Sequence, residues 1–331
     1  MHRSLQLLVT LGSAAALAPA RTSRRRSTVT MGGAGDVKKW FADSGRGDAK
    51  PSGGSLGGSG WAQTGKWVTD DAQYFVKQTS QSYKSMFAGE AAGLTAMRLA
   101  SESGGEPALR IPEVFHAADF DDGKGSFIVM EFLTMGRGGD AETFGRAMAR
   151  MHLATPKDPE AASGKFGFPV DNTIGATPQP NGWDGDWIKF WSEKRMGHQV
   201  NLAGDASIDR LWQQLKPRMH EFFDEDEDIK PCILHGDLWS GNIGTAAGAP
   251  SIFDPACYYG HHEAEWGMSW CASLGPGFWA GYRELIPEAP KFRMRRPLYE
   301  AYHQLNHYNL FGGGYRNAAC GCLEQCLGSL D

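Results

Sequence analysis

Apolar runs of two kinds divide the chain into predicted strands and helices. Residues 74–77 and 127–133 are rich in β-branched and aromatic side chains, which predicts two strands. Residues 86–94 and 144–153 are predicted to be helical, the second because its apolar positions recur at helical spacing. Residues 232–234 form a shorter apolar strand, and the polar residues that follow it carry the first candidate chemistry.

The loop after this strand runs from His235 to Asn242 and reads HGDLWSGN, and a later apolar run ends at Asp254. An H-x-D-x-x-x-x-N loop followed by such an Asp is the pattern of a kinase-type phosphotransferase site. Asp237 can orient an acceptor hydroxyl and take its proton. Asn242 and Asp254 offer the hard oxygen ligands that Mg²⁺ prefers.

The alternative for this loop is a plain turn, because Asp and Asn beside Gly are most often turn residues. The order and spacing of Asp237, Asn242 and Asp254, between strand-like flanks, favour the catalytic interpretation. A second, independent half-site would decide between the two.

A candidate nucleotide half of the site lies upstream. Lys77 ends the first predicted strand, and Glu90 follows thirteen residues later on the first predicted helix. A strand Lys paired with a helix Glu holds an ammonium against the nucleotide phosphates in kinase-like folds. Taken alone, each residue would be an ordinary exposed charge; taken with the downstream residues, the two favour a phosphate site.

A glycine-rich segment, residues 52–61, precedes Lys77 and could bring backbone N–H groups close to phosphate. It matches neither G-x-G-x-x-G nor the Walker pattern, so a flexible linker is the alternative. The loop candidates are Gly57, Gly58, Ser59 and Gly60.

The end of the apolar run 127–133 is the expected hinge between two lobes, where backbone groups can meet adenine. Glu131 and Leu133 are the candidates there by position.

With these residues the chain resembles the fructosamine kinases, also called ketosamine-3-kinases, from about residue 52 to residue 316. An HGD motif with a downstream Asp is shared with aminoglycoside phosphotransferases and choline kinases, whereas the other segments narrow the resemblance to ketosamine kinases. The segments that carry it are LHGDLWSGN (234–242), FDPACYYGHHE (253–263), FVK (75–77) and LNHYNLFGGGYR (305–316).

The resemblance implies an α+β, bilobal protein-kinase-like fold. Its small, β-rich N-lobe would bind nucleotide across residues 51–133, and its larger, mainly helical C-lobe, residues 134–319, would hold the catalytic and sugar-binding groups. The implied activity is phosphorylation, with ATP and Mg²⁺, of the third-carbon hydroxyl of a ketosamine, the adduct of a sugar and an amine. Because the phosphorylated adduct breaks down and frees the amine, such kinases act in deglycation of small ketosamines or glycated proteins.

The resemblance also implies a role for each motif residue. Asp237 would be the catalytic base, and Asn242 and Asp254 would be Mg²⁺ ligands. Lys77 would bind phosphate, with Glu90 as its partner. His235 and Trp239 would contact the substrate. Trp239 would give the sugar ring a flat apolar face; the alternative is a packed aromatic that supports the loop.

Two groups of histidines could be mistaken for metal sites. His261, His262 and Glu263 are adjacent on an irregular segment and lack the spacing of zinc ligands, so we interpret them as structural or substrate-side polar groups. His303 and His307 are four residues apart, and a packed pair on one helix is the interpretation that we favour.

Composition excludes some classes of partner. The 331 residues are 41% hydrophobic and can bury a full core. The net charge of −5 falls to about −10 without residues 1–30, which hold five Arg and no acid. An acidic body argues against nucleic acid or an anionic membrane as the main partner; oligomeric state is not predicted.

The two ends of the chain are expected to lie outside the catalytic unit. Residues 1–30 combine a short apolar core with an Arg- and Ser-rich stretch, which suggests a bipartite plastid presequence. Mitochondrial import, secretion or a cytoplasmic protein that starts at Met31 are the alternatives. Residues 31–50 are expected to be a mobile arm, and residues 320–331 a tail whose three cysteines are either a redox or metal-binding group or incidental thiols on a frayed end.

Two other functions compete with the ketosamine kinase. One is a small-molecule kinase for another acceptor, such as an aminoglycoside or choline. The other is a nucleotide-binding pseudokinase, which the complete set of Lys77, Glu90, Asp237, Asn242 and Asp254 argues against.

Overall fold

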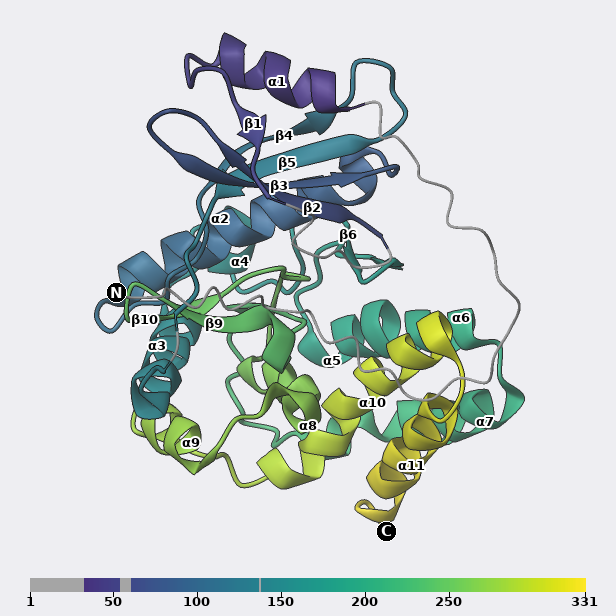
Figure 1. Ribbon diagram of the computed structural model, residues 1–331. Coiled ribbons are helices and arrows are strands. Elements are labelled where there is room, and N and C mark those ends of the chain that lie inside the picture. The colour runs from purple at the N-terminus through teal and green to yellow at the C-terminus, as the bar shows by residue number, and fades with distance from the viewer. Residues whose placement is uncertain (1–32, 54–60, 137) are drawn as a thin grey trace. The chain divides into compact units, whose positions relative to one another are not determined.

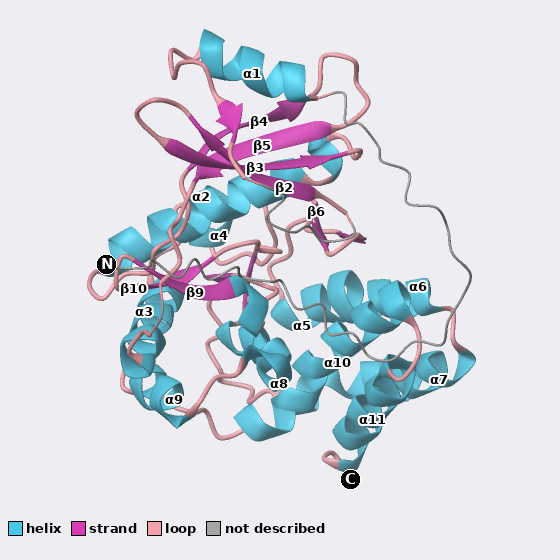
Figure 2. Cartoon of the chain, viewed as in Figure 1, coloured by secondary structure: helices cyan, strands magenta, loops and turns pink. Residues whose placement is uncertain are grey.

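The computed structural model describes residues 33–53, 61–136 and 138–331, which divide into two compact units. The first unit consists of the described residues up to Tyr83 together with Val114–Leu133, and the second of Lys84–Glu113 and Thr134–Asp331. Strands gather in the first unit and helices dominate the second (Figure 2). Among the described residues, no helix is long and apolar enough to cross a membrane.

The first unit is built on an antiparallel sheet of five strands. Because side chains alternate across a sheet, Tyr74 and Val76 face a core that also buries Phe127 and Val129, whereas Lys77 faces the opposite side. The strands, in their order across the sheet, are β1 (Lys50–Pro51), β2 (Gln63–Val68), β3 (Gln73–Thr79), β5 (Ser126–Glu131) and β4 (Val114–Asp119).

Helix α1 (Ala34–Asp43) corrects the expectation of a mobile arm over residues 31–50. Helix α1 lies beside the sheet of the first unit (Figure 1). Val37 and Phe41, one turn apart, are fully buried in the core of the sheet. Trp40 stacks on His116 with 5.1 Å between ring centroids. Two buried apolar residues and one stacked ring therefore dock a helix in which four of the ten residues are charged.

The second unit is mainly helical and carries three short two-stranded sheets, β6–β7, β8–β11 and β9–β10. A rare π-helix, Trp191–Gly197, follows α5, and short 3₁₀ helices follow α7, β8 and β11. The helices are α2 (Phe87–Gly104), α3 (Ala141–Leu153), α4 (Pro159–Ala162), α5 (Trp187–Phe190), α6 (His198–Ala203), α7 (Ala206–Leu215), α8 (Ser269–Ala272), α9 (Pro276–Arg283), α10 (Phe292–Phe311) and α11 (Tyr315–Gly328). The strands are β6 (Asn172–Ile174), β7 (Thr177–Gln179), β8 (Cys232–Leu234), β9 (Ile243–Ala246), β10 (Ala249–Ile252) and β11 (Tyr258–Gly260).

Helix α2 groups with the second unit, although the sequence places it between strands of the first. Gly89 and Gly93 leave one face of the helix without side chains, and Asn172 and Cys257 pack into that space. A Cβ added at Gly89 would lie 2.2 Å from the Cβ of Asn172. The chain therefore passes from the first unit to the second after Leu133, where the boundary was expected, and residues 84–113 also group with the second unit.

Helix α11 corrects the expectation of a frayed tail. It spans the three cysteines and packs against α7 and α10. Cys322 and Cys326 are buried with Leu323, and burial raises the pKa of the Cys322 thiol to about 12. These two thiols belong to the core of the unit rather than to a reactive tail.

An ion pair fixes α11 to the start of α7. Asp205 accepts hydrogen bonds from the backbone N–H groups of Ser207 and Ile208 and from the Arg316 guanidinium at 2.6 and 2.9 Å. The Arg316 bonds, followed by the backbone N–H groups, hold the pKa of Asp205 at about 2. The carboxylate therefore stabilises the fold above its ordinary pKa near 4, and this stabilisation is lost as the pH falls through 2.

We expect Asp205→Ala to lower the free energy of unfolding by about 2 kcal/mol at pH 7, because a helix cap and an ion pair are lost together. Asp205→Asn keeps a capping oxygen and should lose about half as much. Urea unfolding measures both variants. If both variants lost the same free energy of unfolding, the helix cap at Asp205 would make no contribution separate from the ion pair.

Candidate active site

The HGD loop begins where β8 ends. His235 is fully buried; its Nδ1 accepts from the Asp237 N–H at 3.2 Å, and its Nε2 lies 2.9 Å from the Phe253 carbonyl, to which it donates in that tautomer. Both ring nitrogens therefore bind backbone. The expected substrate contact of His235 is corrected by this geometry: the ring ties the loop to the end of the β10 strand.

The β9–β10 hairpin brings Asn242 and Asp254 together. Ile243 pairs with Ile252, and the Phe253 N–H donates to the Asn242 carbonyl at 3.2 Å. The Asn242 Nδ2 donates to the Asp237 carbonyl at 2.9 Å and to the Asp254 carbonyl at 3.2 Å. Because the amide nitrogen binds backbone, Oδ1 is the atom of Asn242 that suits a cation.

Asp254 has an unusual backbone conformation. Its φ of 61° lies in the left-handed region, although it is not glycine and precedes Pro255. Such strain persists where the surrounding structure imposes it, and it concentrates at functional sites. The Asn242 side chain and the hairpin hold this turn, which leaves the Asp254 side chain exposed.

Asp237 is half-buried, and its environment favours the neutral acid. Burial, and then the negative charges of Asp254 and Glu265, raise the pKa of Asp237 to about 7, while a hydrogen bond from Asn242 opposes the shift. A bound divalent cation would offset the Asp254 charge. A carboxyl with a pKa near neutrality is suited to accept a proton during turnover.

Sequence reasoning missed the residue that holds the loop from behind. Glu265, on the 3₁₀ helix His262–Met268, is buried and accepts from the His235 N–H at 2.7 Å and the Gly236 N–H at 3.0 Å. His152 lies 3.4 Å away and also contacts the Tyr282 hydroxyl. Although burial opposes ionisation, the bonds from His152 and His235 keep the pKa of Glu265 below its usual value. Its only signal in the sequence is an acid within an apolar, aromatic run.

The Trp239 ring packs over Gly241, which follows two residues later in the loop. A Cβ at Gly241 would lie 2.2 Å from the ring, so any larger residue there would displace the Trp239 ring. The Trp239 side chain nevertheless remains half-buried. Both expected roles, support of the loop and contact with a sugar, fit this position, and the sugar contact stays a prediction.

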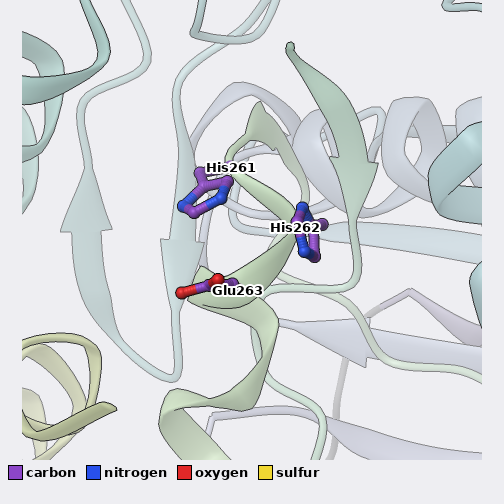
Figure 3. Close-up of side chains that lie close together, drawn as sticks. All are labelled: His261, His262 and Glu263. Carbon is purple, nitrogen blue, oxygen red and sulfur yellow. The ribbon is translucent and has the colours of Figure 1, made fainter. Parts of the chain in front are cut away.

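The adjacent residues His261, His262 and Glu263 lie close together in Figure 3, with candidate ligand atoms within 4.8 Å of one another. Both Glu263 oxygens accept from the Arg295 guanidinium at 2.7 Å, and His261 contacts the Tyr299 hydroxyl. A guanidinium in direct contact takes the place that a cation would need. These contacts agree with a structural role for His261 and Glu263.

The nucleotide-side residues lie in both units. Lys77 is buried on β3 of the first unit, and Glu90 is buried in the first turn of α2 of the second unit. Glu131 ends β5, opposite Tyr74. The roles of these residues and of Leu133 stay predictions, and Gly57, Gly58, Ser59 and Gly60 lie outside the described residues.

A model of the fructosamine kinase family matches residues 45–329. The chain belongs to the fructosamine kinase family. The match runs beyond the expected limits at both ends and includes α11, in agreement with the packing of that helix.

Individual relatives agree with this assignment. The chain is 42% identical to the chloroplastic protein-ribulosamine 3-kinase of Oryza sativa subsp. japonica over 93% of this chain and 88% of that protein. A protein from Thermobifida fusca assigned to the fructosamine-3-kinases has a structure with a TM-score of 0.74 at 25% identity, covering 88% of this chain and 98% of that one. An aminoglycoside phosphotransferase in complex with AMP-PNP and hygromycin B has a TM-score of 0.53 at 15% identity over 88% of this chain and 97% of that one, which shows the fold alone. The expected α+β, protein-kinase-like fold is confirmed.

The hairpin that carries the candidate metal ligands turns through two residues, Ala247 and Gly248, which both have positive φ. This is the geometry of a type I′ turn, in which Asn-Gly is preferred. We expect Ala247→Asn to raise the free energy of unfolding by about 0.5–1 kcal/mol. Ala249→Asn, at the first strand position, is the matched control and should not stabilise. Thermal unfolding measures both variants. Equal melting temperatures for the two variants would contradict the assignment of a type I′ turn.

Proposed function

We propose that the chain is an ATP-dependent kinase that phosphorylates the 3-hydroxyl of ketosamines and so initiates deglycation. The observation that carries this proposal is the grouping of Asp237, Asn242 and Asp254 on backbone held by Glu265. Membership of the family, and the ketosamine acceptors named for its relatives, support this choice of substrate.

In the proposed reaction the acceptor oxygen attacks the γ-phosphorus of ATP. The bond from that phosphorus to the bridging oxygen breaks, ADP leaves, and the hydroxyl proton passes to Asp237. Lys77 would bind the nucleotide phosphates, with Glu90 as its partner. Catalysis then rests on placement of the acceptor and on stabilisation of charge rather than on a covalent intermediate.

Asn242 and Asp254 would hold Mg²⁺. An amide oxygen and a carboxylate are the hard donors that this ion prefers, and its remaining positions suit water and nucleotide phosphate. When bound, the ion supplies charge that stabilises the transferred phosphoryl group. The proposal therefore requires a divalent cation for turnover.

The compartment is proposed from two observations. Residues 1–30 have the composition of a plastid presequence, and the rice relative is named chloroplastic. We infer a plastid location.

ADP release in the presence of Mg²⁺ tests the function. A ribulose– or fructose–lysine adduct should stimulate ADP release, whereas free lysine, the free sugar, choline and an aminoglycoside should not. Stimulation by choline or the aminoglycoside alone would replace the proposed acceptor. Nucleotide binding without transfer to any acceptor would favour the pseudokinase.

A further inference from the structure

Four neighbouring aromatic side chains of the second unit, two exposed (Trp270 and Phe311) and two half-buried (His307 and Tyr315), form a group that we call the aromatic ledge. Trp270 on α8 is 40% exposed, and its ring meets His307 at 5.7 Å between centroids. His307 in turn contacts Phe311 and Tyr315 at 5.7 and 4.9 Å. Phe311 is 59% exposed. Neighbouring large aromatic side chains that remain exposed commonly mark a binding surface.

The Trp270 end of the ledge lies beside the catalytic loop. Helix α8, which carries Trp270, packs against the 3₁₀ turn Ser240–Asn242. Burial, and then the charges of Asp237 and Glu300, raise the pKa of the adjacent Cys271 thiol to about 12. Cys271, the residue next to Trp270, is therefore close enough to Asp237 and Glu300 for their negative charges to raise its pKa. All of these residues belong to the second unit.

The ledge itself carries no positive charge at neutral pH. Burial lowers the pKa of His307, and its Nδ1 donates to the His303 carbonyl at 2.7 Å. Flat, uncharged rings next to a loop that carries a carboxylate complement a ligand that is both apolar and cationic. The amine half of a ketosamine has this character, because its nitrogen is a protonated secondary amine that bears an alkyl arm.

We infer that the ledge, and Trp270 in particular, binds the amine-side arm of the acceptor, the methylene chain of a glycated lysine. This inference rests on the proposed function. In a ketosamine the nitrogen lies only a few bonds from the 3-hydroxyl, so an acceptor at Asp237 extends its arm toward neighbouring groups. Trp270 is a specificity-determining residue and touches no reacting atom.

Two acceptors with the same ketose test the inference. One carries Nα-acetyl-lysine and the other methylamine, so that the second lacks the methylene arm together with the amide and carboxylate at its end. Trp270→Ala should raise KM for the lysine adduct about tenfold, the loss expected from one or two uncovered methylenes, with KM for the methylamine adduct changed less than about threefold. The kcat and the KM for ATP should stay within about twofold of wild type, because binding in the ground and transition states changes equally.

Three controls separate this inference from other causes. Trp270→Phe keeps an aromatic face and should restore most of the affinity for the lysine adduct. Leu202→Ala removes an apolar side chain that is 49% exposed on α6, and KM should be unchanged for both acceptors. An equal rise in KM for both adducts, or no rise in either, would overturn the role of Trp270 while phosphate transfer by wild type still upheld the proposed function. Absence of transfer from wild type to both adducts would overturn the function and the inference with it.

Discussion

Asp237→Asn is expected to lower kcat by about 10²–10⁴-fold, the usual contribution of a positioned general base. The amide has nearly the same shape but cannot accept the hydroxyl proton at neutral pH. Steady-state kinetics with a ketosamine and Mg·ATP measure the loss, and KM for ATP should change little because Asp237 is not a proposed nucleotide ligand.

The same variant has an opposite effect on stability. The folded-state pKa of Asp237 is raised to about 7, so its ionised form is disfavoured in the fold above the ordinary pKa of a carboxyl. Asp237→Asn should therefore unfold at an equal or higher urea concentration than wild type at pH 8 without divalent cations. A variant that kept near wild-type kcat would remove Asp237 from the mechanism. If the variant were inactive only because it was unfolded, the proposed role of Asp237 as the base would lose its support.

Glu265→Gln is expected to affect both stability and rate. The glutamine can accept from only one of the two backbone N–H groups that the carboxylate holds, and it loses the negative charge beside His152. We expect a loss of about 3 kcal/mol in the free energy of unfolding, because a buried, charged hydrogen-bond network is broken. We also expect kcat to fall about 10–100-fold, because the loop that places Asp237 shifts.

Glu263→Gln is the matched control for this prediction. Glu263 lies on the same 3₁₀ helix and is equally buried, but it binds Arg295 and not the loop. It should destabilise the protein to a similar extent while kcat stays close to wild type at a temperature where both variants are folded. If the two variants lost kcat equally, the effect would come from general destabilisation rather than from loop placement.

The features that could be predicted from the sequence are those set by local order along the chain. Asn242 and Asp254 meet because a short hairpin joins them, and apolar residues on both sides of a turn indicate such a hairpin. The strand position of Lys77 follows in the same way from the residues around it. Local pattern therefore identified the candidate base and metal ligands before any tertiary contact was known.

The missed features depend on partners far away in the sequence. Val37 and Phe41 are too few to predict a docked helix until the sheet core that receives them is known. Glu265 is indistinguishable from a surface acid until the backbone of His235 and Gly236 supplies its donors. His235 shows the converse, because its place in the motif suggested a substrate contact, whereas its two ring nitrogens contact the backbone of Asp237 and Phe253.

Phosphorus NMR of the product tests the central claim most directly. Wild type incubated with Mg·ATP and a fructose–lysine adduct should yield a phosphate ester on the third carbon of the sugar, and the ester should then break down to release free lysine. Asp237→Asn should give none of this product over the same time. An ester at another position, or one that forms equally with the Asp237→Asn variant, would contradict the account.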